Sequence, residues 1–186
     1  YMKELHVTSF KFYLDKTNRL EEHYGLTPGT GLLGNKREVM DILKTLKRLD
    51  ENAVLCLHCE DTEIFYPEQS LTFDNPELDQ YHLSSYSKAR PDFGEASAVL
   101  SVLWVNHVVD GNIYIVHNSA GADVRLARQL KPILRGKVGM ETCPHYLVLD
   151  ENCPAQLNAT VVPPIRTAAD SEELWEGIKD GTITSM

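Results

Sequence analysis

The sequence lacks a long apolar segment and has no excess of positive charge. None of its apolar runs approaches the roughly 20 residues that a membrane-spanning helix needs, and residues 1–4 show no signal-peptide core. Lys and Arg number 18 against 27 Asp and Glu, which gives a formal net charge of -9 and disfavours a phosphate backbone as a partner. We therefore expect a soluble, cytoplasmic protein that binds neither membranes nor nucleic acid.

Cysteine is also scarce, with four residues and no dense disulfide framework. Cys56 and Cys59 have the CxxC spacing of a zinc ribbon. No second CxxC accompanies them, and the run from Ala53 to His58 is typical of a buried strand rather than a metal-binding knuckle. We expect reduced thiols that pack in the interior.

The composition is that of a globular domain, with 42% hydrophobic and 24% charged residues over 186 positions. No Gly/Ser/Pro linker and no fixed-period repeat divides the chain, so we treat residues 1–186 as one partial domain. Two long segments, 13–36 and 60–90, are rich in Pro, Gly and Tyr. Loops of this length in a compact domain tend to cover active sites.

Apolar runs alternate with helical patterns along the chain. Four short runs are typical of buried parallel strands: residues 7–14, 53–58, 113–117 and 138–142. Between and after them, apolar spacings of three and four predict helices around 39–49, 96–104 and 122–134, and a fourth from Asp170, with Asp170 and Glu173 as a capping box, to near Gly181. Residues 183–186 are typical of the approach to another strand.

Strands that alternate with helices indicate a parallel sheet, either doubly wound or closed into a barrel. Polar groups favour the barrel, because Lys11 interrupts the first run while His58, His117 and Glu141 stand at strand ends, where βα barrels carry their reactive groups. A complete barrel has eight units in ~250 residues. The predicted fold is therefore α/β, a partial (β/α)8 TIM barrel of about four consecutive βα units.

Lys11, His58 and His117 are the residues with the clearest chemical potential. An ammonium among the aromatic residues that flank Lys11 must be paired with a carboxylate, neutralised or modified, for example by carboxylation to an anionic metal ligand. His58 and His117 could each be a core residue held by a hydrogen bond. Two strand-end histidines followed by small polar turns could equally share one metal site.

Six motifs in order resemble the cyclic amidohydrolases of the amidohydrolase superfamily, the hydantoinases, dihydropyrimidinases, allantoinases and dihydroorotases. The resemblance extends over nearly the whole chain. The motifs are Ser9-Phe-Lys-Phe12, Leu57-His-Cys-Glu-Asp61, Ala89-Arg-Pro91 with Gly94-Glu-Ala96, Tyr114-Ile-Val-His-Asn-Ser119, Glu141-Thr-Cys-Pro-His-Tyr-Leu147 and Val162-Pro-Pro-Ile-Arg166.

The resemblance implies a hydrolase of non-peptide C–N bonds that opens a small cyclic amide or ureide. Lys11, as a carbamate, would bridge two divalent metal ions, for which zinc is the expected metal, and His58 and His117 would ligate one of them. A metal-activated hydroxide would then attack a ring carbonyl. The implied His-x-His pair would precede Tyr1 and the general-base Asp would follow Met186, so we expect at most one complete metal site and no turnover by this chain alone.

Departures from the family pattern leave the ring substrate open. The tyrosine expected five residues after the lysine is replaced by Lys16, and Tyr13, only two residues after Lys11, is expected to point elsewhere although it remains a candidate substrate contact. His145 and Val162 are further candidate substrate contacts. Arg166 is expected to anchor a loop to a carboxylate rather than to hold substrate.

Two other interpretations remain open. The chain could be a non-catalytic scaffold that keeps the fold of dihydropyrimidinase relatives, and such a scaffold would bind no stoichiometric zinc. It could also be a self-associating half-barrel, because half a barrel leaves open sheet edges and an apolar face. We expect a homo-oligomer on the second ground.

Overall fold

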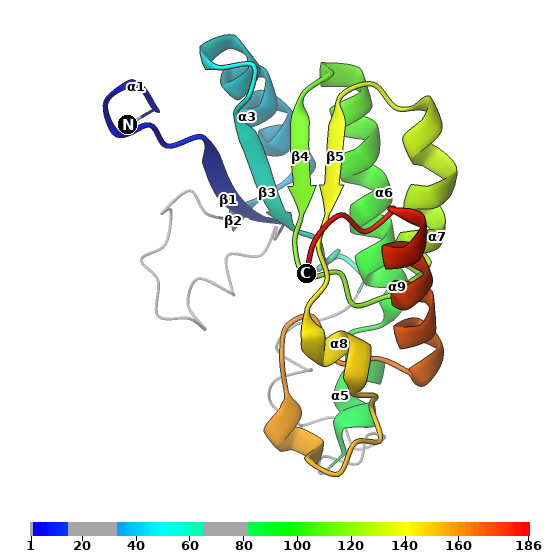
Figure 1. The fold of residues 1–186 in the computed structure, drawn as a ribbon. Coiled ribbons are helices and arrows are strands. Elements are labelled where there is room, and N and C mark those ends of the chain that lie inside the picture. Colours follow the sequence, from blue (N-terminus) through cyan, green and yellow to red (C-terminus); the bar gives the residue numbers. More distant parts are fainter. Residues whose placement is uncertain (1, 15–32, 65–81) are drawn as a thin grey trace.

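The computed structural model describes residues 2–14, 33–64 and 82–186, and it contains one parallel sheet (Figure 1). The strand order is β2-β1-β3-β4-β5, and every pairing is parallel. The strands are β1 (Ser9–Leu14), β2 (Leu33–Gly34), β3 (Val54–His58), β4 (Asn112–Ile115) and β5 (Lys137–Met140). β2 is a short addition at the edge that the sequence did not predict.

The helices follow the strands in the order expected for consecutive βα units. They are α1 (Met2–Leu5), α3 (Lys36–Leu49), α5 (Leu83–Ala89), α6 (Asp92–Val109), α7 (Gly121–Leu130), η1 (Lys131–Ile133), α8 (Pro144–Val148), η2 (Gln156–Ala159) and α9 (Ala168–Asp180). The chain is α/β and forms part of a (β/α)8 barrel, as predicted, with β3, β4 and β5 each followed by a helix and β1 followed by β2 and then α3. None of the helices in the described part has both the length and the apolar character that crossing a membrane requires.

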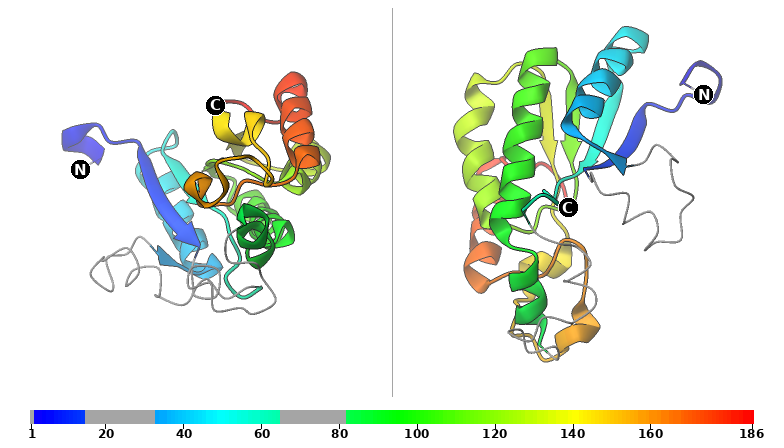
Figure 2. Two further views of the ribbon diagram at one scale, coloured as in Figure 1. Left: turned by 90° about the horizontal axis from the view of Figure 1, so that it is seen from below. Right: turned by 180° about the vertical axis from the view of Figure 1, so that it is seen from behind.

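Helices α3 and α6 cover one face of the sheet. In Figure 1 the strands β3, β4 and β5 stand in front of α3 and α6, and the rear view in Figure 2 shows these helices in front of the strands. Alternate strand residues such as Leu55, Leu57, Ile113 and Ile115 are buried against this layer. The intervening residues, including Lys11, therefore face the opposite side, the interior of the partial barrel.

The end of β4 differs from the prediction, and this difference affects the position of His117. β4 ends at Ile115, two residues before His117, although the sequence predicted a strand through residue 117. His117 adopts a left-handed backbone conformation with φ of 42°. Strand alternation is broken at that point, and the turn rather than the pleat sets the direction of the His117 side chain.

The helix termini correct one prediction. The capping box of α9 is formed by Thr167 and Asp170, whose side chains accept hydrogen bonds from each other's backbone N–H, so the predicted pairing of Asp170 with Glu173 is wrong. Glu173 lies instead beside Arg128 of α7, 2.6 Å away. The helix ends at Gly181 as predicted, in the left-handed conformation that glycine favours.

The last residues lie along β5, as expected for the approach to a strand. The Thr184 amide donates to the Met140 carbonyl at 2.8 Å, and Glu141 and Ser185 form a parallel bridge. Other predictions fall outside the described residues. These are the Lys16 substitution and most of the two long segments predicted to be loops.

Candidate metal centre

Two histidines meet at the carboxyl ends of neighbouring strands. His58 is the last residue of β3, and His117 follows β4 in its left-handed turn. The Nδ1 atom of His58 lies 3.3 Å from the Nε2 atom of His117, and the ring planes are inclined by 65°. The structure therefore brings together two residues that are 59 positions apart in the sequence.

The histidine pair fits a divalent metal ion. Burial lowers the pKa of His117 to about 3, helped by the nearby charges of His58 and Lys11, so its ring is neutral at physiological pH. Neutral imidazole nitrogens are good zinc ligands, and with Zn–N bonds of about 2.0–2.1 Å a tetrahedral ion separates two such nitrogens by about 3.3 Å. The observed spacing matches that value.

Lys11 lies on the same inner face as the histidines. It is paired with Cys56 in the sheet register, and its Nζ atom lies 4.8 Å from the centre of the Tyr13 ring. Burial lowers the pKa of Lys11, against the opposing effect of Cys59, Cys56 and Glu141. A lowered pKa increases the fraction of neutral amine, the form that reacts with carbon dioxide, but carboxylation of Lys11 stays a prediction.

Tyr13 reaches the histidine pair, so the expectation that it points elsewhere is wrong, because residues two apart on a strand share a face and Tyr13 is paired with His58 in the sheet register. Its ring centre lies 5.0 Å from that of His58 and 4.8 Å from Lys11 Nζ, so Tyr13 lies beside both groups. His145 packs on Tyr146 with ring centres 4.2 Å apart, and Val162 precedes Pro163, whose carbonyl accepts from the Tyr146 hydroxyl. Substrate contact by these residues stays a prediction.

No group of three or more His, Cys, Asp or Glu side chains able to hold a metal occurs within residues 2–14, 33–64 and 82–186. Two imidazoles therefore need a donor of another type, such as a modified Lys11. All four cysteines are free thiols, and Cys59 lies in the hydrophobic core. A zinc-ribbon role for Cys56 and Cys59 has no support in this arrangement.

The other ring nitrogen of His58 is held by a buried carboxylate. Its Nε2 atom lies 3.0 Å from Glu60 Oε2, and the Arg90 guanidinium donates to both Glu60 oxygens. Burial would raise the pKa of Glu60, but Arg90 and His58 outweigh it and hold the pKa far below the usual range. Glu60 is therefore an ionised carboxylate that accepts a hydrogen bond from His58 Nε2–H, which leaves the Nδ1 lone pair free to bind an ion.

The turn that carries His117 is held from two sides. Asn118 donates from its side chain to the carbonyls of Ile115 and Glu141, at 3.0 and 2.7 Å. The backbone amide of Ser119 donates to Glu95 Oε1 at 2.8 Å. Sequence reasoning identified neither Glu60 nor Glu95 as a site residue. The available signal was their acidic character inside otherwise apolar or small-residue segments.

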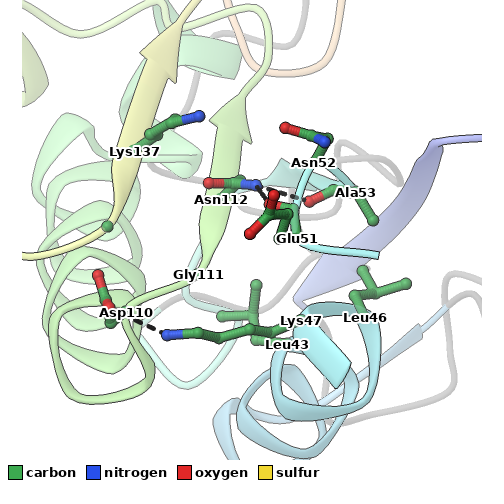
Figure 3. A pocket seen from close by; sticks show the side chains of 11 residues that line it. Leu43, Leu46, Lys47, Glu51, Asn52, Ala53, Asp110, Gly111, Asn112 and Lys137 are labelled. Carbon is green, nitrogen blue, oxygen red and sulfur yellow. Dashed lines mark hydrogen bonds and ion pairs between the residues drawn. The ribbon is translucent and has the colours of Figure 1, made fainter. Parts of the chain in front are cut away.

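A separate hollow of about 340 Å³ lies at the amino ends of the same strands (Figure 3). It is lined by residues at or before the starts of β3, β4 and β5, among them Glu51, Asp110 and Lys137. Lys47 forms an ion pair with Asp110 at 3.0 Å across its rim, and Asn112 donates to the Glu51 carbonyl. Neither histidine is among the residues that line it.

The chain is similar in sequence to known enzymes. No family model matches the chain. A dihydroorotase from Acetivibrio thermocellus is 35% identical over 131 residues, which cover 68% of this chain and 28% of that enzyme. A D-phenylhydantoinase from Escherichia coli O9:H4 is 31% identical over 192 residues, which cover 98% of this chain and 36% of that enzyme.

Solved structures share the fold at lower sequence identity. A D-hydantoinase from Bacillus sp. AR9 superposes with a TM-score of 0.77 at 20% identity, over 99% of this chain and 38% of that one. A dihydropyrimidinase from Brevibacillus agri gives 0.76 at 23% identity, over 99% and 38%. The chain thus spans roughly a third of the length of the curated relatives that it matches.

Proposed function

The chain is related in sequence and fold to the cyclic amidohydrolases of the amidohydrolase superfamily, and we propose that it forms part of a metal-dependent hydrolase that opens a small cyclic amide or ureide. The observation that carries this proposal is the histidine pair. Two ring nitrogens, His58 Nδ1 and His117 Nε2, lie 3.3 Å apart at the carboxyl ends of parallel strands, where βα barrels perform their chemistry.

Each residue of the pair would have a defined task. His58 and His117 would donate Nδ1 and Nε2 to a divalent ion, and Glu60 would hold the His58 ring in the tautomer that this requires. Lys11, carboxylated, would supply an anionic oxygen from the neighbouring strand. An ion bound there supplies Lewis acidity, which polarises an amide carbonyl and makes water more acidic.

The relatives define the substrate class of the proposal. Their names point to hydantoin and dihydroorotate rings, in both of which the nitrogen of the ring amide also belongs to a cyclic urea. Tyr13 would contact such a ring, because it lies against both Lys11 and His58. His145 and Val162 are proposed as more distant substrate contacts. Of the two metal ions that the family resemblance implies, the described residues supply ligands for one.

Metal content tests the proposal. The chain is equilibrated with zinc and bicarbonate, freed of excess metal and analysed for zinc per chain. We expect about one zinc, lost in the double variant His58→Asn with His117→Asn. Carbon-13 bicarbonate should give a carbamate resonance that disappears in Lys11→Arg. Absence of stoichiometric zinc would favour the non-catalytic scaffold instead.

Ring opening is assayed with the complete encoded polypeptide and with this chain alone. The panel contains hydantoin, dihydrouracil, allantoin and dihydroorotate, and the product is measured as the ring-opened acid. We expect activity in the complete polypeptide that is lost in Lys11→Ala. If the Lys11→Ala protein retained full activity, the assignment of Lys11 would be wrong.

A further inference from the structure

The two histidines are connected to a buried network of ionic groups on their outer side. Four charged side chains in it are almost fully buried: Glu60, Arg90, Glu95 and Arg166 have exposed fractions of 1%, 1%, 2% and 4%. They come from the segment after β3, the end of α5, the first turn of α6 and the segment before α9. Their positions in the chain span more than 100 residues.

The first half of the network ends on His58. Arg90 donates from Nε to Glu60 Oε1 at 3.1 Å and from Nη2 to Oε2, while Glu60 Oε2 faces His58 Nε2 at 3.0 Å. Because Arg90 engages both oxygens, Glu60 serves as an acceptor and the proton belongs on His58 Nε2. The lone pair of Nδ1 then points towards His117.

The second half ends on the turn after His117. Glu95 accepts from the Ser119 amide at 2.8 Å and from the Ser119 hydroxyl at 2.6 Å. Arg166 lies behind this contact, with Nη2 3.0 Å from Glu95 Oε2 and Nε 3.1 Å from the Ser119 hydroxyl oxygen. Ser119 is two residues from His117, so this half holds the backbone that carries the second ring.

One hydrogen bond joins the halves. Arg166 Nη1 donates to the backbone carbonyl of Arg90. An unbroken series of contacts therefore runs from the His58 ring through Glu60, Arg90, Arg166 and Glu95 to Ser119. A displacement of either Arg would change the support of both histidines, although the hydrogen bonds of Arg166 go to Ser119, Arg90 and Glu95 rather than to either ring.

Fold stability alone accounts poorly for this arrangement. Burial of an ion pair costs desolvation that its attraction often fails to recover, and well-packed apolar residues can replace such pairs with little loss of stability. Here two buried ion pairs are joined, and each of them contacts a segment that carries a histidine. Such contacts are directional, whereas apolar packing is not. They fix the direction and separation of two ring nitrogens.

We propose that Glu60, Arg90, Glu95 and Arg166 form a single positioning network that sets the geometry of the His58–His117 pair and thereby its affinity for a divalent ion. The proposal rests on the proposed function, since it assumes that the pair binds metal. Arg166 and Glu95 are positioning residues that act at a distance from the ion, and Glu60 acts directly on His58.

Cobalt(II) and zinc(II) binding by the chain test the network. Visible absorption of bound cobalt reports the coordination geometry, and competition with a chromophoric chelator gives the zinc dissociation constant. We expect Glu60→Gln to weaken zinc binding by about 10- to 100-fold and to alter the cobalt spectrum. The double variant Glu95→Met with Arg166→Met removes a remote pair as a unit, and we expect about 10-fold weaker binding. The variant Arg166→Lys should recover part of the affinity.

Two controls separate the possible outcomes. Arg128→Met removes partly exposed ion pairs with Glu173 and Asp180 on the outer helices and should leave metal binding unchanged. Circular dichroism of each metal-free variant identifies the folded proteins to be compared. Unchanged zinc affinity and cobalt spectrum in the folded double variant would overturn the network while leaving the proposed function intact. Failure of the unmodified chain to bind metal through His58 and His117 would overturn both.

Discussion

The two ends of the same strands use charged residues in opposite ways. At the carboxyl ends, Arg90, Glu60, Glu95 and Arg166 are buried and bonded to one another. At the amino ends, Lys47 and Asp110 form an ion pair whose side chains are 42% and 56% exposed beside an open hollow. Buried charges must satisfy strict geometry, whereas exposed charges can exchange partners with water. Precise positioning is therefore concentrated at the carboxyl ends, where the histidines lie.

The largest expected effect comes from breaking a buried pair at the carboxyl ends. The variant Arg90→Met leaves Glu60 charged and uncompensated in the interior, and we expect a loss of about 3–5 kcal/mol in the free energy of unfolding. Urea denaturation of the chain measures it. A loss below about 1 kcal/mol would mean that water or another group replaces Arg90. The proposed difference between buried ion pairs at the carboxyl ends and exposed ion pairs at the amino ends would then be wrong.

A second prediction concerns the amino ends of the strands, where stability is expected to depend on the backbone conformation of Gly136 rather than on a charged pair. Gly136 has φ of 77°, and a Cβ atom there would lie 2.5 Å from the Gly111 carbonyl oxygen. The variant Gly136→Ala should cost about 1–3 kcal/mol of stability, because it combines an unfavourable backbone conformation with a backbone clash. Its zinc affinity should match that of the unmodified chain. A changed affinity would show that the two ends are coupled.

A third prediction concerns a buried acid next to the network. Burial, and then the nearby charge of Glu95, raise the pKa of Asp123 well above its usual value, so the folded state favours the protonated form. The stability that Asp123 contributes is present below its unfolded pKa of about 3.8 and is lost as pH rises towards the folded pKa. Asp123→Asn should therefore gain stability relative to the unmodified chain as pH increases from about 4 to 7.

Urea denaturation at several pH values measures this difference. Ser101→Ala, on the outer helix α6, serves as a control that carries no titratable group. A difference between Asp123→Asn and the unmodified chain that stays constant with pH would contradict a raised pKa for Asp123.

Much of the framework could be predicted because it depends on local patterns. Buried parallel strands are continuous apolar runs, so β1, β3, β4 and β5 were found within a few residues of their ends. Polar residues that interrupt or follow these runs identified Lys11, His58 and His117. The convergence of the two histidines follows from adjacent strands in one parallel sheet.

The remainder depends on contacts between distant segments. Arg90 and Glu60 are 30 positions apart and Arg166 and Glu95 are 71 apart, and nothing local selects these carboxylates from the others. The left-handed turn at His117 was also missed, because the apolar run continues through Val116 and is typical of an unbroken strand. The support of the site is thus less visible in the sequence than the site itself.

The smallest expected loss of stability comes from breaking the exposed ion pair between Lys47 and Asp110 at the amino ends. Lys47 donates to Asp110 at 3.0 Å and to the Val109 carbonyl at 3.1 Å, at the end of α6. Because both charges are solvated, Lys47→Met should cost little stability, far less than Arg90→Met, and the cost should shrink as salt concentration rises. Urea denaturation at low and high salt measures it, with Lys44→Met on the same helix as the control. A stability loss comparable to that of Arg90→Met would show that solvent exposure does not determine how much an ion pair contributes at the two ends of the strands. The contrast between the buried and the exposed ion pairs would then be wrong.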